Sequence, residues 1–124
     1  MAETNIRGNG FNAFDAVAAA KTLTLADSGV VQKVTASVTV TLPAVATAVA
    51  GTTYIVQVGG YGLTVVIDVA AADYIFGGNI ATPADGKTIT FTNQPAGSFV
   101  KLVSNGTVGF GISEVNGTFV REAA

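Results

Sequence analysis

The chain has 124 residues, a length that fits one domain better than two. Hydrophobic residues make up 49% of the chain and charged residues 11%, whereas about 25% of the residues in a typical soluble domain are charged. The net charge of −2 and the scarcity of Lys and Arg argue against nucleic-acid binding through a basic surface. Because so few charges favour self-association, we expect another protein to cover part of the surface.

The residues needed for common catalytic and metal sites are missing. Cysteine and histidine are both absent, which excludes disulfides, thiol chemistry and the ordinary serine triad, and removes the commonest metal ligand. The closest pair of carboxylates is Asp68 and Asp73, whose spacing fits a turn in which Asp side chains bond the nearby backbone. We therefore expect a protein that is not an enzyme, with no catalytic residues, no metal and no cofactor.

The first 20 residues differ from the rest. The stretch "TNIRGNG" is polar and glycine-rich, without periodicity. The following stretch, 12–21, begins with a possible N-cap and contains good helix formers, but it is too short to be stable alone. A basic start is absent and Asp15 interrupts the apolar residues, so a signal peptide is not expected. We interpret residues 1–20 as an arm or short helix, which either orders against another surface or frays, and residues 21–124 as the folded domain.

A run without any charged side chain extends from Val34 to Ile67. It is long enough to span a membrane, but it is rich in Thr and contains a proline and several glycines. In "SVTVTLP", Val38, Val40 and Leu42 alternate with Ser and Thr, which is the period of a strand with one buried face. Threonine is β-branched and carries a hydroxyl, so it suits the solvated face without a charge. We therefore predict a strand here and no contact with a membrane.

The middle of the chain continues the alternation after a short interruption. The stretch "AVATAVA" at 44–50 fits either a short helical turn or a loop of small residues. In "GTTYIVQVGG", Tyr54, Val56 and Val58 share one face of a strand. The glycine cluster "GGYG" predicts a hairpin turn before the strand in "YGLTVVIDVA", with Tyr61 at an exposed tip.

The C-terminal third also reads as strands and turns. Ile89 and Phe91 alternate with Thr in "GKTITFTNQ", and "GSFVKLVSNG" is joined to "TVGFGISEVNG" through Asn-Gly, the strongest short hairpin signal. Another Asn-Gly precedes "TFVRE". Turn signals spaced roughly 8–12 residues apart predict an all-β fold, a single antiparallel sandwich or barrel-like, jelly-roll-like domain. The aromatic residues expected in its core are Phe91, Phe99, Phe110 and Phe119.

Six motifs occur in a characteristic order: "KTLTLADSG", "VTVTLP", "AGTTYIVQ", "GKTITFTN", "GSFVKLVSNGT" and the ending "FGISEVNGTF". In this order they resemble a module of tailed-phage virion proteins, found in small capsid decoration (cement) proteins, head fibres and tail-fibre segments. The resemblance covers roughly Lys21 to Arg121. Many relatives have Gly-Trp and Gly-Thr-Trp where this chain has Gly109-Phe110 and Gly117-Thr118-Phe119, a departure that keeps aromatic bulk.

The resemblance implies a structural role on the capsid surface of a virion. A decoration protein binds the major capsid protein, is itself a homo-oligomer, most often a trimer, and needs no nucleic acid or membrane. Because it binds only the assembled shell, it stabilises that shell by mass action. This role is consistent with the scarcity of charge, since subunit and shell contacts would cover exposed faces.

The arm is the segment where we expect the contacts to lie. Its large apolar residues stand where no strand pattern would bury them, and we hypothesise capsid or subunit contacts by Ile6, Arg7, Phe11 and Phe14. The alternative is a phage fibre or tail-tip module that binds a host-surface glycan, for which Tyr61 is the candidate contact. A β-domain adhesin or assembly factor unrelated to phages is a third possibility.

Overall fold

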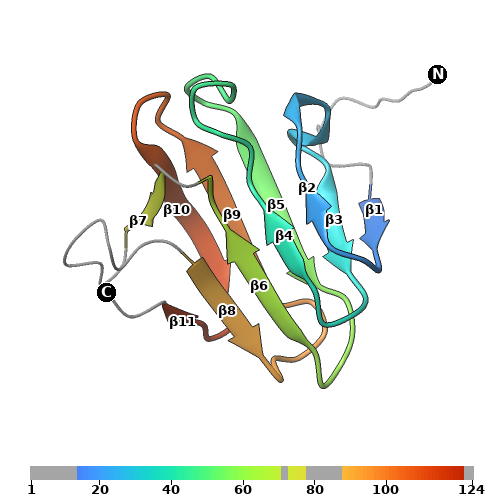
Figure 1. Cartoon of the computed structure of the whole chain (residues 1–124). Coiled ribbons are helices and arrows are strands. Elements are labelled where there is room, and N and C mark those ends of the chain that lie inside the picture. Colours follow the sequence, from blue (N-terminus) through green and yellow to red (C-terminus); the bar gives the residue numbers. More distant parts are fainter. Residues whose placement is uncertain (1–13, 71–72, 78–87, 122–124) are drawn as a thin grey trace.

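The computed structural model describes residues 14–70, 73–77 and 88–121, which form two β-sheets packed face to face (Figure 1). The six-stranded sheet has the order β1 (Phe14–Val17), β3 (Val31–Val34), β5 (Thr53–Val58), β9 (Phe99–Ser104), β10 (Gly109–Asn116) and β7 (Tyr74–Phe76). The five-stranded sheet has the order β11 (Val120–Arg121), β8 (Thr88–Thr92), β6 (Thr64–Asp68), β4 (Thr39–Thr41) and β2 (Lys21–Thr22). A short 3-10 turn, η1 (Leu25–Asp27), joins β2 to β3. The predicted all-β sandwich-like class is confirmed.

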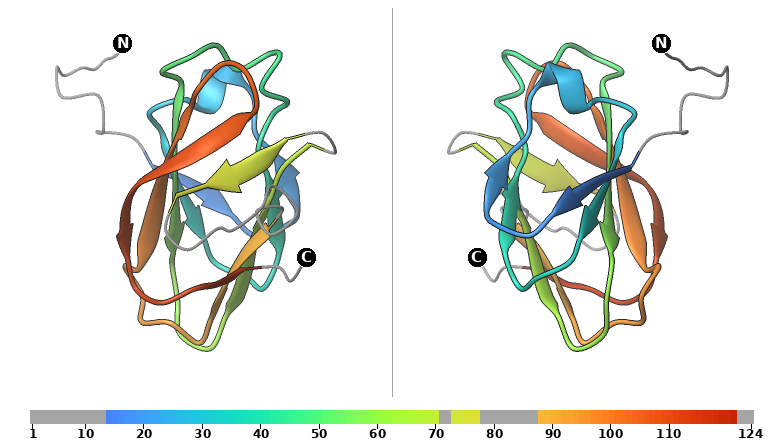
Figure 2. Two further views of the ribbon diagram at one scale, coloured as in Figure 1. Left: turned by 90° about the vertical axis from the view of Figure 1, so that its left-hand side faces the viewer. Right: turned by 90° about the vertical axis from the view of Figure 1, so that its right-hand side faces the viewer.

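The pairing of the strands is mixed, so the expectation of an antiparallel sandwich was wrong in this detail. From β1 to β9 each strand lies in the sheet opposite to the one before it, as Figures 1 and 2 show. From β1 to β5 in one sheet and from β2 to β8 in the other, neighbours within a sheet are therefore alternate strands of the chain. As a result β1, β3 and β5 are parallel, as are β2, β4 and β6, and β7 is parallel to β10. Antiparallel pairs join β5 to β9, β9 to β10, β6 to β8 and β8 to β11.

Of the two hairpins predicted from Asn105-Gly106 and from the glycine cluster 59–62, one is present in the structure and the other is not. The Asn105-Gly106 turn does connect a hairpin, because β9 and β10 are antiparallel neighbours. Asn105 fixes this turn with its side-chain Oδ1, which accepts the backbone N–H groups of Thr107 and Val108 at 2.9 Å. The glycine cluster 59–62 instead leads from β5 to β6 in the facing sheet, so the prediction of a hairpin there was wrong.

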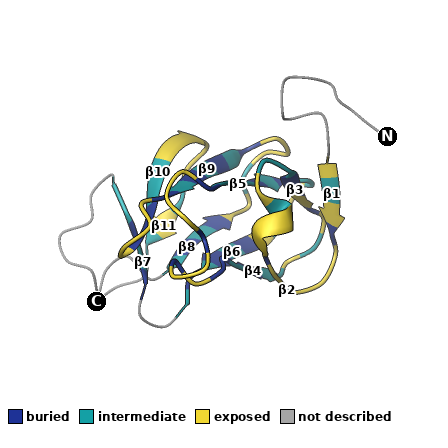
Figure 3. Ribbon diagram, turned by 90° about the horizontal axis from the view of Figure 1, so that it is seen from above, coloured by how far each residue is buried: buried dark blue, intermediate teal, exposed yellow. Residues whose placement is uncertain are grey.

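The core lies between the sheets, and the longer strands such as β5, β6, β8 and β9 contribute alternate residues to it (Figure 3). Of the inward positions predicted from the alternation, Val38 packs against the core but is only partly buried. The others are no more than 1% exposed: Val40, Leu42, Tyr54, Val56, Val58, Ile89 and Phe91. Phe110 is also fully buried, and Phe119 packs against the core while remaining partly exposed. Phe99 was wrongly expected in the core. It starts β9 on the outer side of the sheet, because its neighbour Val100 takes the inward position.

The small-residue stretch 44–50 is a turn that closes one end of the core. The backbone N–H groups of Thr47 and Ala48 both donate to the Ala44 carbonyl, at 2.8 and 3.0 Å. Ala48 is fully buried, and its carbonyl accepts the Ser104 hydroxyl at 2.6 Å. The Val45 N–H donates to the buried Asp73 carboxylate at 2.7 Å. The stretch is held without a charge of its own, because Val45 and Ala48 are buried and several of its backbone groups find partners in the protein.

The folded part begins earlier than residue 21. Residues 14–17 form β1, so the helical interpretation of this stretch was wrong. The strand pairs in parallel with β3, and Val17 is 3% exposed in the core. Pairing and burial outweigh the helix propensity of the alanines, because a segment this short is not stable as an isolated helix. The other arm residues singled out, Ile6, Arg7 and Phe11, lie outside the described residues.

The contact between β7 and β10 depends on a glycine, and we predict that replacing Gly109 by Ala destabilises the protein by about 2–3 kcal/mol. A Cβ at Gly109 would overlap the backbone carbonyl of Tyr74, its partner in the parallel pair. Gly60→Ala is the matched control, since its Cβ would meet only a Leu63 methyl group at 3.5 Å. Urea unfolding followed by circular dichroism measures both. Equal stabilities of the two variants would contradict the predicted clash.

Candidate interaction surface

The outer faces of the two sheets differ in chemistry. The five-stranded sheet presents mainly hydroxyls, from Thr39, Thr41, Thr64, Thr88, Thr90 and Thr92. The outer face of the six-stranded sheet instead carries large apolar side chains, of which the main ones are Phe14, Val31, Ile55 and Phe99. A sheet face that meets only water usually carries polar residues. The six-stranded sheet is therefore the more informative surface.

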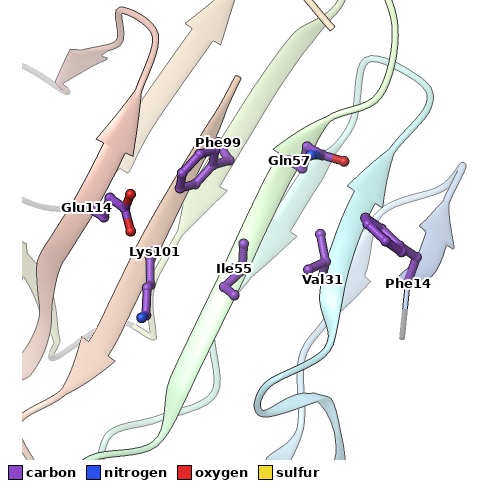
Figure 4. Close-up of a pocket in the computed structure, with 7 residues that line it drawn as sticks. All are labelled: Phe14, Val31, Ile55, Gln57, Phe99, Lys101 and Glu114. Atoms are coloured by element: carbon purple, nitrogen blue, oxygen red, sulfur yellow. The ribbon is translucent and has the colours of Figure 1, made fainter. Parts of the chain in front are cut away.

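A shallow groove with a volume of about 260 Å³ crosses this outer face (Figure 4). We call it the outer groove, and it is lined by Phe14, Val31, Ile55, Gln57, Phe99, Lys101 and Glu114. The strand register sets five of these residues side by side on consecutive strands, in the order Phe14, Val31, Ile55, Lys101 and Glu114. The floor is thus apolar at the β1 end and charged at the β10 end.

The exposure of the groove residues suits contact with another surface. Phe14 is 63% exposed at the β1 edge, and Ile55 and Phe99 are half-buried. Val31, between Phe14 and Ile55, is 8% exposed and forms the floor. Apolar residues grouped on an exposed face are typical of protein–protein interaction sites. The arrangement can bury apolar side chains of a partner, and its charged end can orient that partner.

Of the residues predicted from the sequence as contacts, the structure describes Phe14 and Tyr61, and these two lie in different places. Phe14 lines the outer groove, whereas Tyr61 is 81% exposed in the β5–β6 connection and does not line it. Sequence reasoning missed Ile55 and Phe99. The available signal was an isoleucine in the polar phase of β5, between Thr53 and Gln57, since a solvated face rarely needs one.

The carboxylates considered for chemistry are bonded to the backbone. Asp68 Oδ1 accepts the N–H of the next residue at 2.8 Å, as expected for a turn. The Asp73 carboxylate is 6% exposed and anchors the 44–50 turn through Val45. Within residues 14–70, 73–77 and 88–121, no three acidic side chains gather as a metal site would require. The same residues contain no helix that could cross a membrane.

A lysine closes the edge of the sandwich beside the groove. Lys21 lies on β2, the edge strand of the five-stranded sheet, and its ammonium reaches across to the six-stranded sheet. There it donates to the Asp15 carboxylate on β1 and to Gln32 Oε1 on β3, at 2.9 Å for the latter. Asp27 Oδ1 lies 3.4 Å from the same nitrogen. Because Asp15 follows Phe14 directly, this contact holds the groove's end residue in position.

An arginine closes the opposite edge in a similar way. Arg121 lies on β11, at the other end of the five-stranded sheet. Its guanidinium donates to the backbone carbonyls of Ile75, at 3.1 Å, and of Gly77, which belong to the β7 region of the six-stranded sheet. The Phe119 ring lies 5.7 Å from the guanidinium carbon. Each lateral edge is therefore bridged by one cation.

Two groups near the Lys21 edge have altered ionisation. Burial raises the pKa of the Tyr54 phenol, and the negative charge of Asp27 adds to this. The Tyr54 hydroxyl donates to the Thr24 carbonyl at 3.1 Å, which also requires its proton. Partial burial lowers the pKa of Lys21, but the Asp15 and Asp27 carboxylates outweigh it and the net shift is upward.

We predict that Lys21→Met destabilises the protein by about 1–2 kcal/mol, allowing for solvent screening. The change leaves Gln32, which is fully buried, without the donor to its side-chain oxygen. Lys33→Met is the matched control, because Lys33 is exposed on β3. Urea unfolding measures both variants. If Lys33→Met lowers the free energy of unfolding as much as Lys21→Met does, the contact of Lys21 across the edge is not the cause of the loss.

We also predict that stability falls as the pH rises above about 10, the ordinary pKa of tyrosine. The pKa values of Tyr54 and Lys21 are raised in the folded protein, so their stabilisation is complete below the unfolded values and is lost as the pH passes through the folded ones. The midpoint of urea unfolding at pH 8 and pH 11 tests this. The double variant Tyr54→Phe with Lys21→Met should lose less stability over that interval, and an equal loss would contradict the assignment.

No protein-family model matches the chain, and no curated protein sequence matches it either. The resemblance to phage virion proteins therefore rests on the order of the motifs alone. The outer groove and the two bridged edges supply the physical basis for a functional proposal.

Proposed function

We propose that the chain is a non-enzymatic bacteriophage capsid decoration (cement) protein that binds the assembled head and stabilises the shell. The observation that carries the proposal is the outer groove, which crosses five strands and is apolar at its β1 end, where Phe14 is 63% exposed. When a partner covers a face of this kind, the free energy of the complex falls by about 25 cal/mol for each Å² of apolar surface buried. The partner proposed is the major capsid protein.

The chemistry of the rest of the surface supports a docking role. Charged residues make up only 11% of the chain, and two of the six cations, Lys21 and Arg121, are used to bridge the edges of the sandwich. The outer face of the five-stranded sheet is hydrated through threonine hydroxyls, which bind other surfaces weakly. Of the two outer sheet faces among the described residues, the one with the groove therefore offers the larger apolar side chains to a complex.

Mass action provides the mechanism. A protein that binds the assembled shell and not its dissociated subunits lowers the free energy of the shell by an amount set by its affinity and concentration. The arm residues Ile6, Arg7, Phe11 and Phe14 would add contacts to the shell or to a neighbouring copy. A homo-oligomer, with a trimer as the first expectation, would engage several capsid subunits at once and gain avidity.

One observation favours a second function, that of a fibre or tail-tip module that binds a host-surface glycan. Tyr61 is 81% exposed in a glycine-flanked turn, and an exposed aromatic ring can stack on a sugar. Specific binding in a glycan screen that is lost in Tyr61→Ala would favour this function over capsid decoration.

We predict that Ile55→Lys lowers capsid binding at least tenfold. Ile55 lies at the centre of the outer groove, and the change replaces apolar contact by an ammonium that a complex would have to bury. Val66→Lys is the matched control, because Val66 is half-buried at the centre of the outer face of the other sheet. Co-sedimentation with empty phage heads measures the bound fraction, and circular dichroism checks folding. The proposal fails if the wild-type chain does not sediment with the heads, or if both variants bind as it does.

A further inference from the structure

We infer that residues 1–13 of the same chain occupy the outer groove in the free protein. The inference goes beyond capsid binding, because it concerns the isolated chain and requires no shell. Three observations on the described residues support it: where the segment joins the fold, how far the groove extends, and which charge lies at its far end.

The segment joins the fold at one end of the groove. Residue 13 precedes Phe14, which is both the first residue of β1 and a lining residue of the groove. From there the groove leads over β3, β5 and β9 to Glu114 on β10 (Figure 4). A segment that follows the groove from its point of attachment needs no excursion through solvent.

The length of the segment fits this path. Four strand spacings of about 4.8 Å separate β1 from β10, so the groove is about 19 Å long. Seven residues in an extended conformation cover about 23 Å. Counting back seven residues from Phe14 reaches Arg7, which would therefore stand near Glu114 with little slack.

The chemistry of the segment matches that of the groove. Phe11 would lie over the apolar part near Val31 and Ile55. Arg7 is the only Lys or Arg among residues 1–13. Glu114 is the acidic residue that lines the groove, and it lies at the far end, beyond its register partner Lys101 on β9. Apolar contact at the near end and opposite charge at the far end would fix both the position and the direction of the segment.

The covalent link favours the chain's own segment over that of a second copy. A short tether gives an effective concentration in the millimolar range, so a second copy at lower concentration would compete poorly. An apolar face covered in this way would also help to keep a chain with so few charges monodisperse. A shell that binds at the groove would first have to displace the segment.

Engineered disulfides test the position of the segment, and they are straightforward because the chain has no cysteine. Asn9→Cys is combined with Lys101→Cys in the groove, because five extended residues before Phe14 reach about as far as β9. As the matched control, Asn9→Cys is combined with Val66→Cys on the outer face of the other sheet. Both partner positions are half-buried on central strands. Under mild oxidation at low protein concentration, we expect the groove pair to form an intramolecular disulfide at least tenfold faster than the control pair.

The charge contact is tested in the background that carries the groove pair, Asn9→Cys with Lys101→Cys, in which Glu114 has lost its neighbouring cation. Arg7→Glu should slow formation of the groove disulfide several-fold, and adding Glu114→Arg should restore the rate. Non-reducing electrophoresis and mass spectrometry separate monomeric from dimeric products. Equal rates for the groove and control pairs, or no effect of the charge reversal, would overturn the proposal. A disulfide-linked dimer as the main product would also overturn it, by assigning the groove to the segment of a second copy.

Discussion

The sandwich is held together at its two lateral edges by contacts between the sheets, and very few charged residues make these contacts. Lys21 reaches from β2 to the carboxylate of Asp15 and the amide of Gln32 on the facing sheet, while Arg121 reaches from β11 to two carbonyls in the β7 region. Both cations start from the same sheet and cross to the other. With both edges held, the apolar residues between the sheets remain out of water, and the outer faces are left for other uses.

The two outer faces solve the problem of solubility in different ways. Threonine provides a methyl group for the strand and a hydroxyl for water, so the five-stranded sheet can face solvent without ions. The six-stranded sheet has Ile55 and Phe99 at the equivalent positions, and these gain from being covered. The two sides of the molecule therefore differ: the outer face of the five-stranded sheet is suited to solvent, and that of the six-stranded sheet is suited to contact with another protein surface.

The alternation of residues predicted the core but not the pairing. Val40, Tyr54 and Phe91 occupy the buried positions that a period of two assigns them, because that period depends only on the local backbone. The sheet in which each strand lies depends on the connections. The glycine-rich connection 59–62 fits a hairpin within one sheet and a crossing to the facing sheet equally well. Ile55 could be singled out as an isoleucine among polar residues, but its grouping with the other groove residues could not be predicted, since they meet only after β1, β3, β5, β9 and β10 have paired.

The winding of the chain between sheets has a consequence for the order of folding. Between two paired residues of β1 and β3, or of β3 and β5, the chain passes through a strand of the opposite sheet and returns, as it does between Phe14 and Val31. Such contacts carry a high entropic cost of loop closure. The β9–β10 hairpin has a short loop and can pair before the rest. This hairpin can therefore act as a nucleus against which the N-terminal strands pair later. Because β9 and β10 belong to the same sheet as β1, β3 and β5, that sheet can be completed only after most of the chain has been synthesised.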